Sequence, residues 1–134
     1  MKNLREAENI FKGLADTTRL RIINLLLHGE LCVCDIQRVL GASQPNVSRH
    51  LNYLKNSGLV LDRRNGPRMF YRLSQENGAV HKRLFPFLRD IFRTSDVLVE
   101  DAKKLRTAIA AGACNASEWR PYSALSERTA GRAS

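Results

Sequence analysis

Two cysteines separated by a single residue, Cys32 and Cys34, are the side chains whose type and spacing could do chemistry most directly. Thiolates are soft donors that select soft ions such as trivalent arsenic or antimony over hard cations. Both thiols fall where a short helix is expected to begin, and free N–H groups and the helix dipole favour the thiolate there. Residues two apart in a formed helix point to different faces, so both sulfurs can hold one ion only if the helix start is extended or distorted. The pair predicts a soft-metal site, against the simpler alternative that both cysteines are small buried apolar residues.

The third cysteine, Cys114, is expected at the end of the last helix or in the tail behind it. It could complete a three-sulfur site from its own or the partner subunit. Alternatively, the site has only two protein thiolates. The remaining position on a bound soft ion such as arsenic is then held by a methyl or aryl group, or by a small external ligand. Three is an odd number of cysteines, and in a chain expected to be intracellular it favours reduced thiols over a disulfide framework.

Length and charge narrow the class of protein. A chain of 134 residues is expected to form one domain that gains stability from dimerisation. Its 22 Lys and Arg against 13 Asp and Glu give a net charge of +9, which favours a polyanionic partner, either nucleic acid or an acidic membrane surface. No apolar run approaches membrane-spanning length, and the N-terminus lacks the pattern of a secretory signal. We therefore expect a cytoplasmic protein without a membrane partner.

The elements that must position the thiols follow from apolar periodicity and from capping residues. Leu4 to Leu14 repeats at helical spacing, Asp16 is an N-cap for a second helix that Gly29 ends, and Val33 to Leu40 forms a third, short helix. Ser43 caps a fourth helix, which Gly58 ends. Two strands follow, at 59–64 and 68–73, and the turn residues Asn65-Gly66 between them indicate a β-hairpin.

From Leu84 to Ile109 apolar positions alternate steps of four and three over 26 residues. This heptad-like seam predicts one long last helix, with Pro86 near its start. The seam could pair with a second copy of the chain or pack on the chain's own core. Residues 1–112 are then a winged helix-turn-helix domain for DNA binding and dimerisation, and 113–134 are expected to be a disordered C-terminal tail.

A short helix, a glycine-containing turn and a longer helix make a helix-turn-helix pattern, and the basic hairpin behind it would be a wing. Between residues 35 and 75 there are seven Lys and Arg against two Asp. Short polar side chains with one Arg and one Gln suit base edges and phosphates, and wing arginines suit phosphate or the minor groove. The predicted DNA-binding residues are Ser43, Gln44, Asn46, Ser48, Arg49, His50, Lys55, Arg63, Arg64 and Arg68.

The run Glu30-Leu-Cys-Val-Cys-Asp-Ile, together with the segment from Ser43 to Val60, resembles the ArsR/SmtB family of winged-helix metalloregulators, and within it the arsenic-responsive repressors. The resemblance implies a homodimer that binds double-stranded operator DNA and leaves it when the inducer binds. It also implies that the seam and the first helix supply the dimer interface, at Leu4, Phe11, Leu84, Leu88, Ile91, Leu98, Leu105 and Ile109. The chain departs from the family pattern at Gln37, where inorganic arsenite sensors carry a third cysteine.

The sequence thus predicts a mainly α, dimeric winged helix-turn-helix repressor, released from DNA by As(III) or Sb(III) on Cys32 and Cys34, with Cys114 as an optional third ligand. No constitutive cofactor and no enzymatic activity are expected, because no catalytic motif accompanies the thiols. One alternative is a thiol redox or persulfide sensor of the same fold, in which Cys32 and Cys34 join without metal. Another is an architectural DNA-binding protein with structural cysteines.

Overall fold

The computed structural model of the chain describes residues 3–75 and 79–112. The described part is mainly helical with one small antiparallel sheet, which confirms the predicted fold class. Its elements, in chain order, are α1 (Leu4–Leu14), α2 (Thr17–Leu26), β1 (Leu31–Cys32), α3 (Val33–Leu40), α4 (Gln44–Asn56), β2 (Val60–Asn65), β3 (Arg68–Leu73), α5 (Ala79–Phe92) and α6 (Asp96–Ala110). None of the described helices is long and apolar enough to cross a bilayer. The predicted tail, 113–134, lies outside the described residues.

Local capping signals set the boundaries of α2 and of the helix-turn-helix formed by α3 and α4, as the sequence predicts. The side chain of Asp16 accepts a hydrogen bond from the Arg19 amide at 3.0 Å at the start of α2, and Ser43 accepts from the Asn46 amide at 3.3 Å at the start of α4. Gly41 follows α3 with φ of +65°, a left-handed conformation that glycine adopts without steric cost. These bonds satisfy backbone groups that a helix end leaves free.

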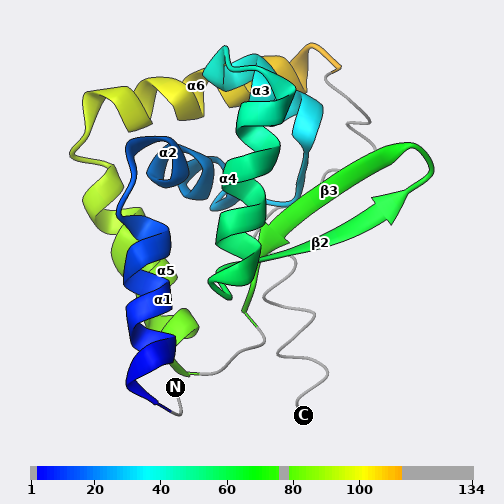
Figure 1. Ribbon diagram of the computed structural model, residues 1–134. Helices are drawn as coiled ribbons and strands as arrows, with labels where there is room; N and C mark the ends of the chain where they lie inside the picture. The colour runs from blue at the N-terminus through cyan, green and yellow to red at the C-terminus, as the bar shows by residue number, and fades with distance from the viewer. Residues whose placement is uncertain (1–2, 76–78, 113–134) are drawn as a thin grey trace, which may run out of the picture.

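Helix α2 is the centre of the core. Five consecutive residues of this helix, from Ile22 to Leu26, are buried, and α2 packs against every other helix and against β3. Helix α6 runs across one end of the molecule and packs on α2 and α3, whereas the β2–β3 hairpin projects beside α4 as a wing, on the side away from α1 and α5 (Figure 1). The fold therefore holds α3, α4 and the wing on one common core.

The sheet contains a strand that periodicity did not predict. Strand order is β1-β3-β2, and β1 pairs antiparallel with β3 in the register Leu31↔Tyr71 and Cys32↔Phe70. A strand of two residues is too short to show alternation, so only the pairing with β3 defines it. The consequence is that Cys32 is bonded through its backbone to the strand that carries the wing.

The hairpin turn lies one residue further along than predicted. Asn65 pairs with Arg68, so the two-residue loop is Gly66-Pro67. Gly66 has φ of +62°, and proline cannot adopt a positive φ. Only a turn with positive φ at its first central residue fits this pair, which is the requirement of a type II′ hairpin.

The prediction of a single last helix from the seam is wrong, because this segment forms two helices, α5 and α6. The hydroxyl of Thr94 donates to the Ile91 carbonyl at 2.6 Å, and the Ser95 side chain accepts from the Leu98 amide at 3.4 Å as the N-cap of α6. Such side-chain bonds compete with helix continuation, so the chain turns between the two helices. Pro86 lies inside α5 rather than near its start, because α5 begins at Ala79.

The predicted dimer seam is also divided by the fold. Leu88, Leu98 and Leu105 are 4%, 9% and 0% exposed and belong to the chain's own core, which corrects their assignment to a dimer interface. Leu84 and Ile109 are partly buried against the same core. The turn at Ser95 folds α6 back onto α2 and α3, so most of the stripe packs within one chain, whereas Ile91 remains 43% exposed.

Candidate functional site

The two cysteines lie at the junction of β1 and α3. Cys32 ends the strand and is the N-cap of α3, with extended backbone (φ −80°, ψ 156°), and Cys34 is the second residue of the helix. The structure joins them in a disulfide, with Cα atoms 5.4 Å apart. The expectation of free thiols is therefore wrong for this state, because the strand-to-helix bend brings both sulfurs together. The same bend is the distortion that the sequence required for the two sulfurs to share one ion.

A carboxylate lies beside the cysteines. The ligand atoms of Cys32, Cys34 and Asp35 are all within 4.8 Å of one another, and no other such group of three or more occurs within residues 3–75 and 79–112. Cys32 is 1% and Asp35 4% exposed, whereas Cys34 is half-buried. Once the disulfide is reduced, the group offers two soft sulfurs and one hard oxygen. That donor set fits a thiol-seeking ion better than an ion that requires only oxygen ligands.

No third sulfur is found near the pair among the described residues. Gln37 lies one turn further along α3, half-buried, and carries an amide where a thiol would be needed. Cys114 lies outside the described residues, so its role as a third ligand remains a prediction. Cys32 is the N-cap, as predicted, but its side chain makes no capping hydrogen bond.

An ion pair between the buried Glu30 and the more exposed Arg63 connects the start of this site to the wing. Arg63 of β2 donates from Nε to both carboxylate oxygens of Glu30 at 2.9 Å, and Glu30 is 4% exposed. The Arg63 guanidinium also lies 4.7 Å from the ring centroid of Phe70, the residue that pairs with Cys32. A displacement of Cys32 would therefore be passed to the wing through two contacts, the Cys32–Phe70 strand pair and the Phe70–Arg63 ring contact. Sequence reasoning missed this role of Glu30, because the partner lies 33 residues away.

Glu30→Gln should lower the free energy of unfolding by about 1–3 kcal/mol, because Arg63 would lose the charged acceptor of its hydrogen bonds. Asp62→Asn is the control: it removes the partner of Lys55 in an exposed pair, where about 0–1 kcal/mol is expected. Urea unfolding at neutral pH measures both. Equal losses in the two variants would mean that the Glu30–Arg63 pair does not hold the wing.

The N-terminal half of α4 presents a polar face next to the turn from α3. Ser43, Gln44 and Arg49 are exposed, and Asn46 and Ser48 are half-buried. Gln44 donates to the Ser48 hydroxyl at 3.4 Å, and Arg49 donates to the Asn46 side chain at 2.8 Å. These side chains lie together on one helix, and their polar types suit the reading of base edges. Their contacts with DNA stay a prediction.

His50 does not belong to this face. Its Nδ1 lies 3.7 Å from the Asp16 carboxylate and 3.4 Å from the Arg19 guanidinium, and its side chain is 13% exposed. Arg19 also stacks over the Tyr53 ring at 4.1 Å. His50 is turned toward α2, where it packs between Asp16 and Arg19, and this corrects its assignment to the DNA-facing set.

The wing arginines differ in their availability. Arg63 is held by the buried carboxylate described above, and Lys55 donates to Asp62 at 2.9 Å. Arg64 is exposed near the tip of the hairpin, and Arg68 is half-buried. Of the predicted wing contacts, Arg64 is therefore the one best placed to meet phosphate.

Arg64→Ala should weaken binding to operator and to random DNA equally and reduce the salt slope by about one unit for each phosphate that is no longer neutralised. Gln44→Ala should mainly shrink the difference between operator and random DNA, by about 1–3 kcal/mol if a good base contact is removed. Fluorescence anisotropy at several salt concentrations separates the two effects. The same loss on both DNAs with the same salt dependence would contradict this division of roles.

Comparison with known proteins agrees with this arrangement. The family described as bacterial regulatory protein, arsR family, matches residues 16–61, which span α2 to the start of β2. The "Arsenical resistance operon repressor" of Escherichia coli (strain K12) is 58% identical over 66 residues, 48% of this chain and 56% of that protein. The matched part of the chain thus spans little more than half the length of this curated relative.

Two solved structures share the fold at higher coverage. HlyU from Vibrio cholerae N16961 superimposes with a TM-score of 0.61 at 33% identity, over 69% of this chain and 97% of that chain. A homodimeric winged helix-turn-helix DNA-binding domain from Mycobacterium bovis, described as a possible ArsR-family transcriptional regulator, gives 0.58 at 35% identity, over 66% and 79%. With this likeness in sequence and in fold, the chain belongs to the arsR family of bacterial regulatory proteins.

Proposed function

We propose that this protein is a transcriptional repressor that binds operator DNA as a homodimer and is released when trivalent arsenic or antimony binds Cys32 and Cys34. The observation that carries the proposal is the meeting of two sulfurs at the start of α3, the helix that precedes the recognition helix α4. Its similarity to an arsenical resistance operon repressor supports the choice of inducer. Such a repressor works in the cytoplasm, where thiols are kept reduced.

The proposed switch follows from shared backbone. An ion held by both thiolates fixes the bend between β1 and α3, and α3 packs directly on α4. Cys32 is also paired with β3, so the same change reaches the wing. Induction then needs only a small shift of α4 and the hairpin relative to each other, which misplaces base-reading groups and phosphate contacts together.

The disulfide supports a second candidate, a redox sensor of the same fold. Two thiols and one molecule of hydrogen peroxide give a disulfide and two water molecules, with both sulfurs oxidised and the peroxide reduced. The proximity of Cys32 and Cys34 satisfies the geometric requirement of this reaction without any metal. In this case oxidation rather than a soft ion would release DNA.

One titration distinguishes the two candidates. The reduced full chain first selects its operator from random duplexes, and fluorescence anisotropy then follows release by arsenite, methylarsenite, antimonite, zinc, cadmium and hydrogen peroxide in parallel. The proposal expects release by the trivalent arsenic and antimony compounds and none by zinc. Release by peroxide alone would establish the redox sensor, and release by no compound would leave an architectural DNA-binding protein.

The homodimer is supported by apolar side chains that remain exposed on α1, α5 and α6. Leu4 is 85%, Phe11 65%, Phe87 58%, Val97 57% and Ile91 43% exposed. Helices α1 and α5 lie along the side of the molecule away from the wing (Figure 1). Exposed apolar groups of this size favour association with a second copy.

Phe11→Glu should weaken self-association at least about tenfold, because a charge would have to be buried in the interface. Folding of the monomer should be unaffected, since Phe11 is largely exposed. Asn9→Glu, at an exposed position of the same helix, is the control and should leave association unchanged. Sedimentation velocity measures both, and an intact Phe11→Glu dimer would exclude α1 from the interface.

A further inference from the structure

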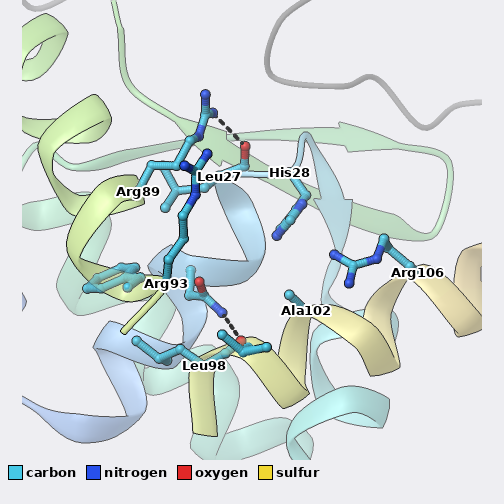
Figure 2. Close-up of a pocket in the computed structure, with 10 residues that line it drawn as sticks. Leu27, His28, Arg89, Arg93, Leu98, Ala102 and Arg106 are labelled. Carbon is cyan, nitrogen blue, oxygen red and sulfur yellow. Dashed lines mark hydrogen bonds between the residues drawn. The ribbon is translucent and has the colours of Figure 1, made fainter. Parts of the chain in front are cut away.

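A pocket between α2, α5 and α6 lies apart from both the thiol site and the DNA-facing helix (Figure 2). Its volume is about 270 Å³. Ligand pockets for drug-sized molecules begin at roughly 300 Å³, so this one suits a single ring or a short branched chain. The proposed function does not use it.

The walls of the pocket combine an apolar surface with positive charge. Leu27, Phe92, Leu98 and Ala102 line it and are each less than about one tenth exposed. Arg89, Arg93 and Arg106 also line it, and none of the described lining residues is acidic. The described lining therefore combines an apolar floor with a net positive charge.

Among the described residues, Arg106 makes no ion pair with an acidic side chain. Arg89 donates to the Leu27 carbonyl at 3.1 Å, which fixes it at the C-terminal end of α2. Arg93 lies 4.0 Å from Asp90 in a pair whose side chains are both more than 70% exposed, where such a pair contributes little. Figure 2 shows His28 and Arg106 extending into the space over Ala102.

The positive charge of the pocket also affects the protonation of His28. Burial lowers the pKa of His28 below its usual value, and the positive charges of Arg106 and Arg89 lower it further. The imidazole is therefore neutral at pH 7 and can donate or accept a hydrogen bond. A bound anion would reduce the repulsion that these side chains exert on one another.

We propose that this pocket binds a small organic anion that has one carboxylate and an apolar body. The carboxylate would pair with Arg106, which Figure 2 draws next to His28, because a guanidinium presents two parallel N–H donors to a carboxylate. The apolar body would contact Leu98 and Ala102 and displace water from them. Since α6 also packs on α3, such a ligand binds to a helix that supports the thiol site.

Calorimetric titration of the reduced full chain with benzoate tests the proposal without DNA and without any metal. Benzamide is the neutral probe of the same shape, and inorganic phosphate is the anion without an apolar body. Benzoate should bind at least about tenfold more tightly than either, since a charged pair and apolar contact are both needed. Equal binding of benzamide or phosphate, or no benzoate binding at millimolar concentration, would overturn the proposal.

Variants locate the site. Arg106→Gln should weaken benzoate binding about tenfold, whereas Arg83→Gln, at an exposed position of α5 that does not line the pocket, should leave it unchanged. Ala102→Leu should fill the floor and abolish binding, with thermal unfolding used to verify that the variant is folded. Equal effects of Arg106→Gln and Arg83→Gln would show that benzoate binds elsewhere, and would refute the assignment even if some binding persists.

Discussion

Replacing Cys32 or Cys34 by serine should abolish the release of operator DNA by arsenite while DNA binding persists. A hydroxyl is a hard donor, so a soft ion loses one of two thiolates. Removing a group that only orients a metal ligand already lowers the affinity for the metal about 10–100-fold. Removing a ligand itself should therefore lower the affinity for arsenite at least about 100-fold. Operator affinity should stay within about threefold, because neither thiol belongs to the exposed face of α4.

The measurement is the arsenite concentration at half-release, followed by anisotropy under reducing conditions. Cys114→Ser is the matched control: with two protein thiolates sufficient, its response to methylarsenite should equal that of the parent chain. Gln37→Cys should increase the response to inorganic arsenite if the site lacks a third sulfur. An unchanged arsenite response in Cys34→Ser would exclude the proposed site, and a general loss in Cys114→Ser would assign that residue as a ligand.

Leu105→Ala should lower the free energy of unfolding by about 2–5 kcal/mol, the usual range for a fully buried leucine. Leu105 is 0% exposed, and it lies on α6 where that helix packs against α2 and α3. The substitution removes apolar contacts and leaves a cavity that these helices can close only in part. For a domain of this size such a loss is a large fraction of the total stability.

Leu4→Ala is the matched control, because the same atoms are removed from a side chain that is 85% exposed. In the monomer the change should cost less than about 0.5 kcal/mol. If Leu4 lies in the dimer interface, its effect should instead grow with protein concentration. Urea unfolding at two concentrations measures both variants, and a smaller loss for Leu105→Ala than for Leu4→Ala would mean that the seam does not pack within the chain.

Helix α2 and the helix-turn-helix that follows it could be predicted from the sequence because their signals are local. Asp16 and Ser43 bond to amides three residues away, and Gly41 needs only its own left-handed conformation. The arsR-family match covers the same part of the chain. The cysteine pair and the polar face of α4 were found in the same way, from residue types at fixed spacing.

The last helices could not be predicted correctly from periodicity. A seam of steps of four and three reports which side of a helix is apolar, but it does not report which surface covers that side. Thr94 and Ser95 carry the local signal for a break, through bonds to Ile91 and Leu98. The apolar positions on both sides of the break conceal that signal, because they continue the same pattern.

By itself the sequence determined the type of fold, the order of its first four helices and hairpin, and the two thiols that lie beside the DNA-reading element. Only the tertiary structure decided that β1 pairs with β3, that Glu30 holds Arg63, that His50 turns to Asp16 and that three arginines gather over one pocket. Capping and turn preferences depend on a few neighbouring residues, and these are visible in any short segment. Pairing and burial depend on residues tens of positions apart, whose proximity arises only when the whole chain has packed its core.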